Sequence, residues 1–155
     1  MSILYVAFDT CALMAVDEGD DETVLIRTQL LSLLYTGFLS GEINVLFDYE
    51  GRITREYSRV LRSNSMGRRL LTVAANHYAI SYAAGTVTSR CAAALTGDRF
   101  DPADVVFIAV AQRTSGVYVT TEEKHLAPAR RRRVQRQCNV GILSLEDLHR
   151  KLTGG

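Results

Sequence analysis

The sequence predicts an α/β protein, a three-layer α/β/α sandwich around a central, mostly parallel sheet. Short apolar runs of strand length alternate along the chain with longer segments of helical length, as in strands joined by crossover helices. The apolar runs are continuous, which is typical of parallel strands buried on both faces. A chain of 155 residues matches the size of one domain, 1–155, with a sizeable core.

The first part of the chain predicts two strands and four helices. The apolar runs "ILYVAF" and "INVLFDY" predict strands over 3–8 and 43–49. The helical segments and their punctuating glycines predict a short helix over 10–16, an acidic turn over 17–22, a long helix over 22–41 that Gly41 stops, and helices over 52–62 and 67–85, the last closed by Gly85.

The second part repeats the alternation. Residues 86–100 are expected to form a short helix and a loop, and a nearly wholly apolar helix follows over 102–114. Strands are expected over 116–121 and 140–144, with a basic stretch between them. The last strand leads into a helix at which Ser144 and Asp147 have capping-box spacing.

Composition narrows the class of protein. A hydrophobic content of 47% with 23% charged residues excludes a disordered or collagen-like chain. Three cysteines without Cys-x-x-Cys spacing give no zinc site and fit a reducing cytoplasm. The opening "MSILYVAFD" has no basic segment and is interpreted as a strand, and no apolar stretch is long enough for a bilayer. We therefore expect a soluble, cytoplasmic protein without a membrane partner.

Two acids in the first part of the chain are candidates for chemistry. Asp9 follows the first predicted strand, at the edge of the sheet where α/β proteins bind ligands. Its simplest alternative role is a helix N-cap. Glu56 lies at the edge of the apolar stripe of its helix, where a carboxylate must be paired, protonated or bound to a cation. An ion pair with Arg59 is the alternative there.

The other candidates flank the second part of the sheet. Asp101 and Pro102 suit the N-cap and first position of the helix over 102–114, so Asp104 is not needed as a cap. Asp104 nevertheless projects among apolar side chains. Glu122 or Glu123 follows the strand over 116–121, and either acid also suits a first helical turn.

These acids are expected to meet at one edge of the sheet, because parallel strands end there together. Carboxylates this close repel one another unless a cation lies between them. Their hard oxygen ligands suit Mg²⁺ or Mn²⁺, which activate water and neutralise charge on a phosphodiester. The sequence therefore predicts a metal site made by Asp9, Glu56, Asp104, and Glu122 or Glu123.

An ordered set of segments resembles the PIN-domain nucleases. The segments are "FDTCAL" (8–13), "ITREYSRVL" (53–61), "DPADVVFIAVA" (101–111), "VYVTTEEKHL" (117–126) and "VGILSLEDL" (140–148). They span nearly the whole chain, although residues 63–100 match only as generic helices. The resemblance implies an α/β/α sandwich with an acidic pocket that binds Mg²⁺ or Mn²⁺ and cleaves RNA.

The resemblance also assigns individual residues. Asp9, Glu56 and Asp104 match the family's acids, with Thr10 as the hydroxyl neighbour of the first. Thr120 and Glu122 match the pair at the end of a strand, where the family usually has Asp in place of Glu. Cys11 stands where the family often has Asn.

The family implies partners as well as an activity. Many compact members are the toxin of a bacterial toxin–antitoxin pair, which implies an antitoxin partner, and a homodimer is a family-level expectation. Because Glu replaces Asp at 122, the alternative is a catalytically impaired module that binds RNA or a protein. The bases at Arg130–Arg133 and Arg136 are interpreted either as phosphate contacts or as a solvated helix face. The scattered histidines, His77, His125 and His149, are interpreted as structural or exposed.

Overall fold

The computed structural model describes residues 2–18 and 21–154, and within them five parallel strands form one sheet. The spatial order is β3-β2-β1-β4-β5. The strands are β1 (Leu4–Phe8), β2 (Ile43–Asp48), β3 (Ile80–Ala83), β4 (Val117–Val119) and β5 (Gly141–Leu143). Val6 of β1 is level with Val45 on one side and Val117 on the other. The predicted α/β class and parallel sheet are confirmed.

Helices connect and cover the strands. They are α1 (Thr10–Ala15), α2 (Asp21–Ser40), α3 (Arg52–Val60), α4 (Met66–Asn76), α5 (Ser89–Gly97), the 3₁₀ turn η1 (Pro102–Asp104), α6 (Val105–Thr114), α7 (Glu123–Leu126), α8 (Pro128–Cys138) and α9 (Leu145–Thr153). Gly19 and Asp20 of the predicted acidic turn lie outside the described residues. No helix in the described part of the chain is long and apolar enough to cross a membrane.

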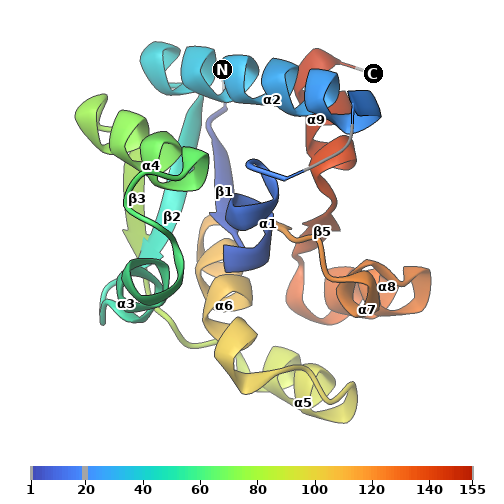
Figure 1. Ribbon diagram of the computed structural model, residues 1–155. Coiled ribbons are helices and arrows are strands. Elements are labelled where there is room, and N and C mark those ends of the chain that lie inside the picture. The colour runs from blue at the N-terminus through green and yellow to red at the C-terminus, as the bar shows by residue number, and fades with distance from the viewer. Residues whose placement is uncertain (1, 19–20, 155) are drawn as a thin grey trace.

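The helices form the two outer layers of the sandwich. Helices α1, α2 and α4 pack together, and α9 packs on α2. Helix α6 crosses the sheet from β3 to β4, and α5 packs on α8. Right-handed crossovers in this strand order put α1–α4 on one face and α5–α8 on the other. In Figure 1, α2 lies beside the end where β1 begins, while α3, α5 and α8 lie toward the opposite end.

The core lies between these layers. Helix α6 is apolar on all sides over residues 106–111, which are all buried between the sheet and the surrounding elements. Phe8, Phe107 and Tyr118 are among the largest fully buried side chains. Close approach of α1 to α4 requires Gly67, since a Cβ there would lie 2.6 Å from the Leu13 carbonyl oxygen. This packing holds α1, which directly follows β1, against α4.

The predicted helix over 67–85 was wrong in its second half. Helix α4 ends at Asn76, Tyr78 has a positive φ of 57°, and Ile80–Ala83 form the edge strand β3. Alanines on both sides favour a helix locally, so the strand is decided by pairing with β2 (Val45 opposite Ile80). The short helix expected within 86–100 is confirmed as α5, with the Thr88 hydroxyl accepting from Cys91 N–H at its start.

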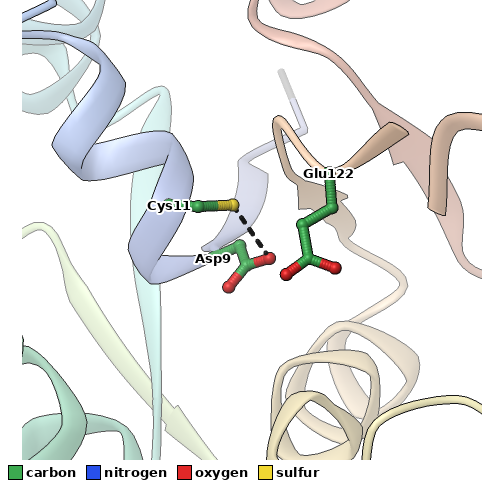
Figure 2. A group of neighbouring side chains, drawn as sticks. All are labelled: Asp9, Cys11 and Glu122. Atoms are coloured by element: carbon green, nitrogen blue, oxygen red, sulfur yellow. Dashed lines mark hydrogen bonds between the residues drawn. The ribbon is translucent and has the colours of Figure 1, made fainter. Parts of the chain in front are cut away.

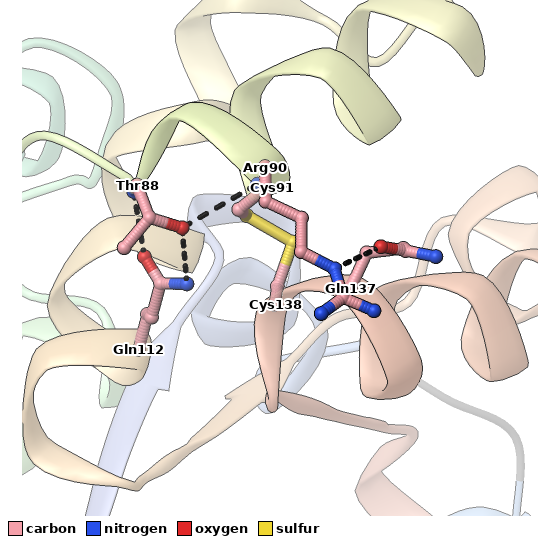
Figure 3. Close-up of a disulfide and its surroundings, with 6 residues drawn as sticks. All are labelled: Thr88, Arg90, Cys91, Gln112, Gln137 and Cys138. Carbon is pink, nitrogen blue, oxygen red and sulfur yellow. Dashed lines mark hydrogen bonds between the residues drawn. A yellow bond between two sulfur atoms is a disulfide. The ribbon is translucent and has the colours of Figure 1, made fainter.

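Two of the three cysteines form a disulfide, which the sequence did not predict. Cys91 of α5 and Cys138 of α8 are both buried and are bonded to each other (Figure 3). Beside the bridge, Arg90 Nε donates to Gln137 Oε1 at 2.5 Å, again between α5 and α8. Disulfides persist mainly in oxidising compartments, so the cysteines no longer argue for a reducing cytoplasm.

Candidate metal centre

The candidate site lies where β1 and β4 end side by side, in the middle of the sheet. The chain leaves β1 for β2 on one side and returns to β4 on the other, so this is the point where the strand order switches. Asp9 directly follows β1, and its N–H donates to the Val119 carbonyl oxygen of β4 at 2.8 Å. Thr120 follows β4. Backbone pairing therefore places these two side chains next to each other.

Asp9 occupies the N-cap position of α1, as its alternative role required, but its side chain makes no capping hydrogen bond. Its Oδ2 instead accepts from Tyr118 Oη at 2.7 Å, Thr120 Oγ1 at 2.8 Å and Cys11 Sγ at 3.2 Å. Burial and the charges of Asp9 and Asp104 raise the pKa of Tyr118 well above its ordinary value, so its hydroxyl remains a donor. Three donors fix one carboxylate oxygen, and Oδ1 has no hydrogen bond among the described residues.

Thr120 and Thr10 have different surroundings, although both were candidates. Thr120 Oγ1 donates to Asp9 and also accepts from the Glu122 N–H at 3.1 Å, which links the turn after β4 to the acid after β1. Thr10 is buried, and its Oγ1 has no hydrogen-bond partner among the described residues. Thr120 therefore organises the site directly.

Asp104 ends η1, and its buried side chain forms no cap hydrogen bond, whereas Asp101 accepts from Ala103 N–H as predicted. The partner of Asp104 is His125 of α7, whose Nε2 lies 3.0 Å from Asp104 Oδ2. His125 is fully buried. Apart from its position after a strand, His125 has no feature in the sequence that points to this role, and it was interpreted as structural or exposed.

Glu122, and not Glu123, faces the other acids. In Figure 2 its carboxylate points toward that of Asp9, while Glu123 is exposed at the start of α7. Glu122 Oε2 lies 3.2 Å from His125 Nε2 and 3.5 Å from Lys124 Nζ. Neither contact has hydrogen-bond geometry, so this oxygen is buried without a hydrogen bond. A buried carboxylate oxygen without a donor is an expected position for a cation ligand.

Glu56 is less closely joined to this group. It forms the ion pair expected as its alternative, with Arg59 Nη2 3.5 Å from Glu56 Oε1. Partial burial, together with the charges of Asp104, Asp9 and Asp101, nevertheless raises the pKa of Glu56 despite the opposing charge of Arg59. Glu56 therefore shares the electrostatic field of the cluster but is not in its close-contact groups.

Two groups of potential ligand atoms, each within 4.8 Å, occur in the described part of the chain. They are Asp9, Cys11 and Glu122, and Asp104, Glu122 and His125. Cys11 is a poor ligand because burial and the charge of Asp9 raise the pKa of its thiol, which donates to Asp9. The remaining carboxylates, with Glu122 common to both groups, suit a hard divalent cation.

Other polar residues near the sheet end have structural roles. Asp48 caps α3, since its Oδ1 and Oδ2 accept from the Ile53 and Arg52 N–H groups at 2.8 and 3.0 Å. Tyr57 of α3 donates to the Phe8 carbonyl oxygen at 2.5 Å, and burial raises the pKa of Tyr57 well above its ordinary value. These bonds attach α3, and hence Glu56, to the ends of β2 and β1. Neither residue was among the candidates predicted from the sequence.

The arginine run of α8 is largely engaged within the protein. Arg130 contacts His125 and the Asp98 carbonyl oxygen, Arg131 pairs with Asp147, and Arg133 pairs with Asp98. Arg132 and Arg136 are exposed. Arg130 and Arg131 are partly buried, and the exposed Arg133 also has an intramolecular partner, which neither interpretation of the run predicted.

Comparisons with protein-family models, with curated proteins and with solved structures find no match for this chain.

Proposed function

We propose that the protein is a divalent-metal-dependent endoribonuclease that hydrolyses RNA phosphodiester bonds. The observation that carries this proposal is the shared position of Glu122, which belongs to both groups of potential ligand atoms and has a buried Oε2 without a hydrogen bond. Carboxylates this close together repel one another, and a cation of high charge between them removes that repulsion. The resemblance to PIN-domain nucleases supports the same activity.

Asp9, Asp104 and Glu122 would hold Mg²⁺ or Mn²⁺, and Glu56 would act at the edge of the cluster. Such a cation lowers the pKa of bound water and neutralises charge on the phosphate. Thr120 and Tyr118 hold Asp9 in one orientation through their hydrogen bonds. Arg132 and Arg136, two exposed arginines of α8, would contact the RNA backbone. The proposal extends to a toxin role with an antitoxin partner.

The test is cleavage of a mixed RNA panel by purified protein with Mn²⁺ or Mg²⁺, with and without EDTA. The wild-type protein should cleave only with the cation, and Asp9→Asn and Asp104→Asn should abolish cleavage while leaving the fold intact. Cleavage that persists in both variants contradicts the assignment. Tight RNA binding without cleavage under any divalent cation would instead support the catalytically impaired module.

A further inference from the structure

His125 lies in a chain of contacts that connects α8 to the acidic cluster. Its Nδ1 is 3.0 Å from Arg130 Nη1, and its Nε2 is 3.0 Å from Asp104 Oδ2. Its ring stacks on Phe100 with centroids 4.2 Å apart and planes inclined by 19°. The guanidinium of Arg130 lies over the same Phe100 ring, 5.4 Å from its centroid. The imidazole is therefore held in plane and in orientation.

Arg130 and Asp104 require the same ring nitrogen of His125 to carry the proton. A guanidinium has donors and no acceptor, so Nδ1 must accept from it through its lone pair. The proton of the imidazole then resides on Nε2, which points at Asp104 and Glu122. Arg130 is itself fixed because its Nη2 donates to the Asp98 carbonyl oxygen at 2.5 Å.

One ring proton is shared unequally between two carboxylates. The Nε2–H forms a hydrogen bond with Asp104 Oδ2, whereas Glu122 Oε2 lies 3.2 Å away without hydrogen-bond geometry. Asp104 thus has one oxygen held, and Glu122 Oε2 is left without a donor. A protonated Nε2 cannot coordinate a cation, although this nitrogen lies among the potential ligand atoms.

We propose that His125 is a positioning residue, oriented by Arg130, that holds Asp104 for cation binding and is not itself a ligand. This inference rests on the proposed metal site. Partners that orient ligands in this way strengthen binding, because they remove the cost of ordering the carboxylate when the cation arrives. The site thereby gains a function for Arg130 that is separate from any contact with RNA.

The tautomer can be measured directly on the metal-free protein. Two-bond ¹H–¹⁵N correlation spectra should show His125 protonated at Nε2 in the wild-type chain. Arg130→Met should keep the Nε2–H tautomer, because Asp104 still accepts from it, but should shift the Nδ1 resonance, which loses its donor; Arg132→Met, at the exposed neighbouring arginine, should leave the spectrum unchanged. A wild-type His125 protonated at Nδ1, or an Arg130→Met spectrum identical to that of the wild type, overturns the proposal.

Calorimetric titration with Mn²⁺ tests positioning without relying on activity. In His125→Gln, the amide nitrogen can take the place of Nε2 as donor to Asp104, so affinity should stay close to that of the wild type. His125→Asn reaches only the Nδ1 position, so affinity should fall about 10–100-fold. His77→Asn, at an exposed histidine, is the matched control, and circular dichroism and thermal unfolding report the fold of each variant.

The outcomes separate this proposal from the proposed function. Equal losses of Mn²⁺ affinity in His125→Gln and His125→Asn indicate a purely structural histidine and overturn the proposal, as does wild-type affinity in a folded His125→Asn. Mn²⁺ binding that follows the expected order without any RNA cleavage retains the positioning role and rejects the nuclease.

Discussion

Thr120 Oγ1 lies 2.8 Å from Asp9 Oδ2, so the residue that follows β4 is hydrogen bonded to the residue that follows β1. The same hydroxyl accepts from the Glu122 N–H. One side chain thus fixes an acid on each of two neighbouring strands. This relationship makes Thr120 the structural centre of the acidic cluster.

Thr120→Val keeps the shape of the side chain and removes the hydrogen bonds of its hydroxyl to Asp9, to the Glu122 N–H and to Cys11 Sγ. A bond to a charged group contributes about 1.5–3 kcal/mol, so we expect the free energy of unfolding to fall by that amount. Mn²⁺ affinity should fall about 10–100-fold because Asp9 loses a donor that orients it. Urea unfolding and calorimetry measure the two effects. Thr36→Val, at an exposed threonine of α2, should change neither, and a Thr120→Val protein with wild-type Mn²⁺ affinity contradicts the role.

Glu56 is expected to destabilise the metal-free protein at neutral pH. Burial and the neighbouring acids raise the pKa of Glu56 in the folded state. At pH values just above the ordinary glutamate pKa, the folded state therefore binds more protons than the unfolded state. This contribution weakens stability as the pH rises through the raised pKa. Glu56→Gln should therefore stabilise the metal-free protein at pH 7, and the gain should disappear as the pH falls below 4, approximately the ordinary glutamate pKa. Thermal unfolding in EDTA at a series of pH values measures this effect, with Glu123→Gln as the control. The same pH dependence of stability in both variants would contradict the prediction.

Asp48 has the opposite pH dependence. Burial alone would raise its pKa, but N–H donors from Ile53 and Arg52 and the Arg52 charge lower it. A lowered pKa contributes stability above the ordinary aspartate range, and this stability is lost as the pH falls through the folded pKa. Asp48→Asn should cost about 0.5–2 kcal/mol at pH 7, as does weakening of a helix cap. Denaturant unfolding should show that cost shrinking below pH 4, approximately the ordinary aspartate pKa; a cost independent of pH would contradict the capping role.

The Cys91–Cys138 bridge should be detectable and stabilising. Peptide mapping without reductant should yield a cross-linked pair, with Cys11 as the free thiol. Because the bridge closes a loop with a sequence separation of 47, replacing both cysteines by alanine should lower the free energy of unfolding by about 2–4 kcal/mol. Cys11→Ala is the comparison that leaves the bridge in place. Free thiols at both positions in protein purified without reductant would contradict the bridge.

Much of the fold could be predicted because strands buried on both faces have an unmistakable apolar pattern. β1 and β2 were predicted to within one residue of their observed ends. β3 was missed because the residues around it favour a helix locally. Its strand conformation depends on pairing with β2, which is a tertiary interaction. The disulfide was missed for the same kind of reason, since only packing of α5 on α8 brings its cysteines together.

The site was only partly predictable. Asp9, Asp104 and Glu122 could be proposed because each stands at the end of a strand or the start of a helix, and such ends meet at one edge. The choice of Glu122 over Glu123 needed the turn geometry set by Thr120. The contacts of His125, which lies on α7, involve side chains from η1 and α8. The spacing of these residues in the sequence does not predict that they meet.

The most direct test of the nuclease site compares Glu122→Gln with Glu123→Gln, since these acids are adjacent in the chain and only the first faces the cluster. The measurement is the initial rate of Mn²⁺-dependent RNA cleavage. If Glu122 helps hold the cation, its stabilisation of the transition state amounts to several kcal/mol, so Glu122→Gln should lose about 100-fold or more in rate, while Glu123→Gln should cleave like the wild type. Equal rates for the two variants, or wild-type cleavage that EDTA does not suppress, would contradict the proposed site.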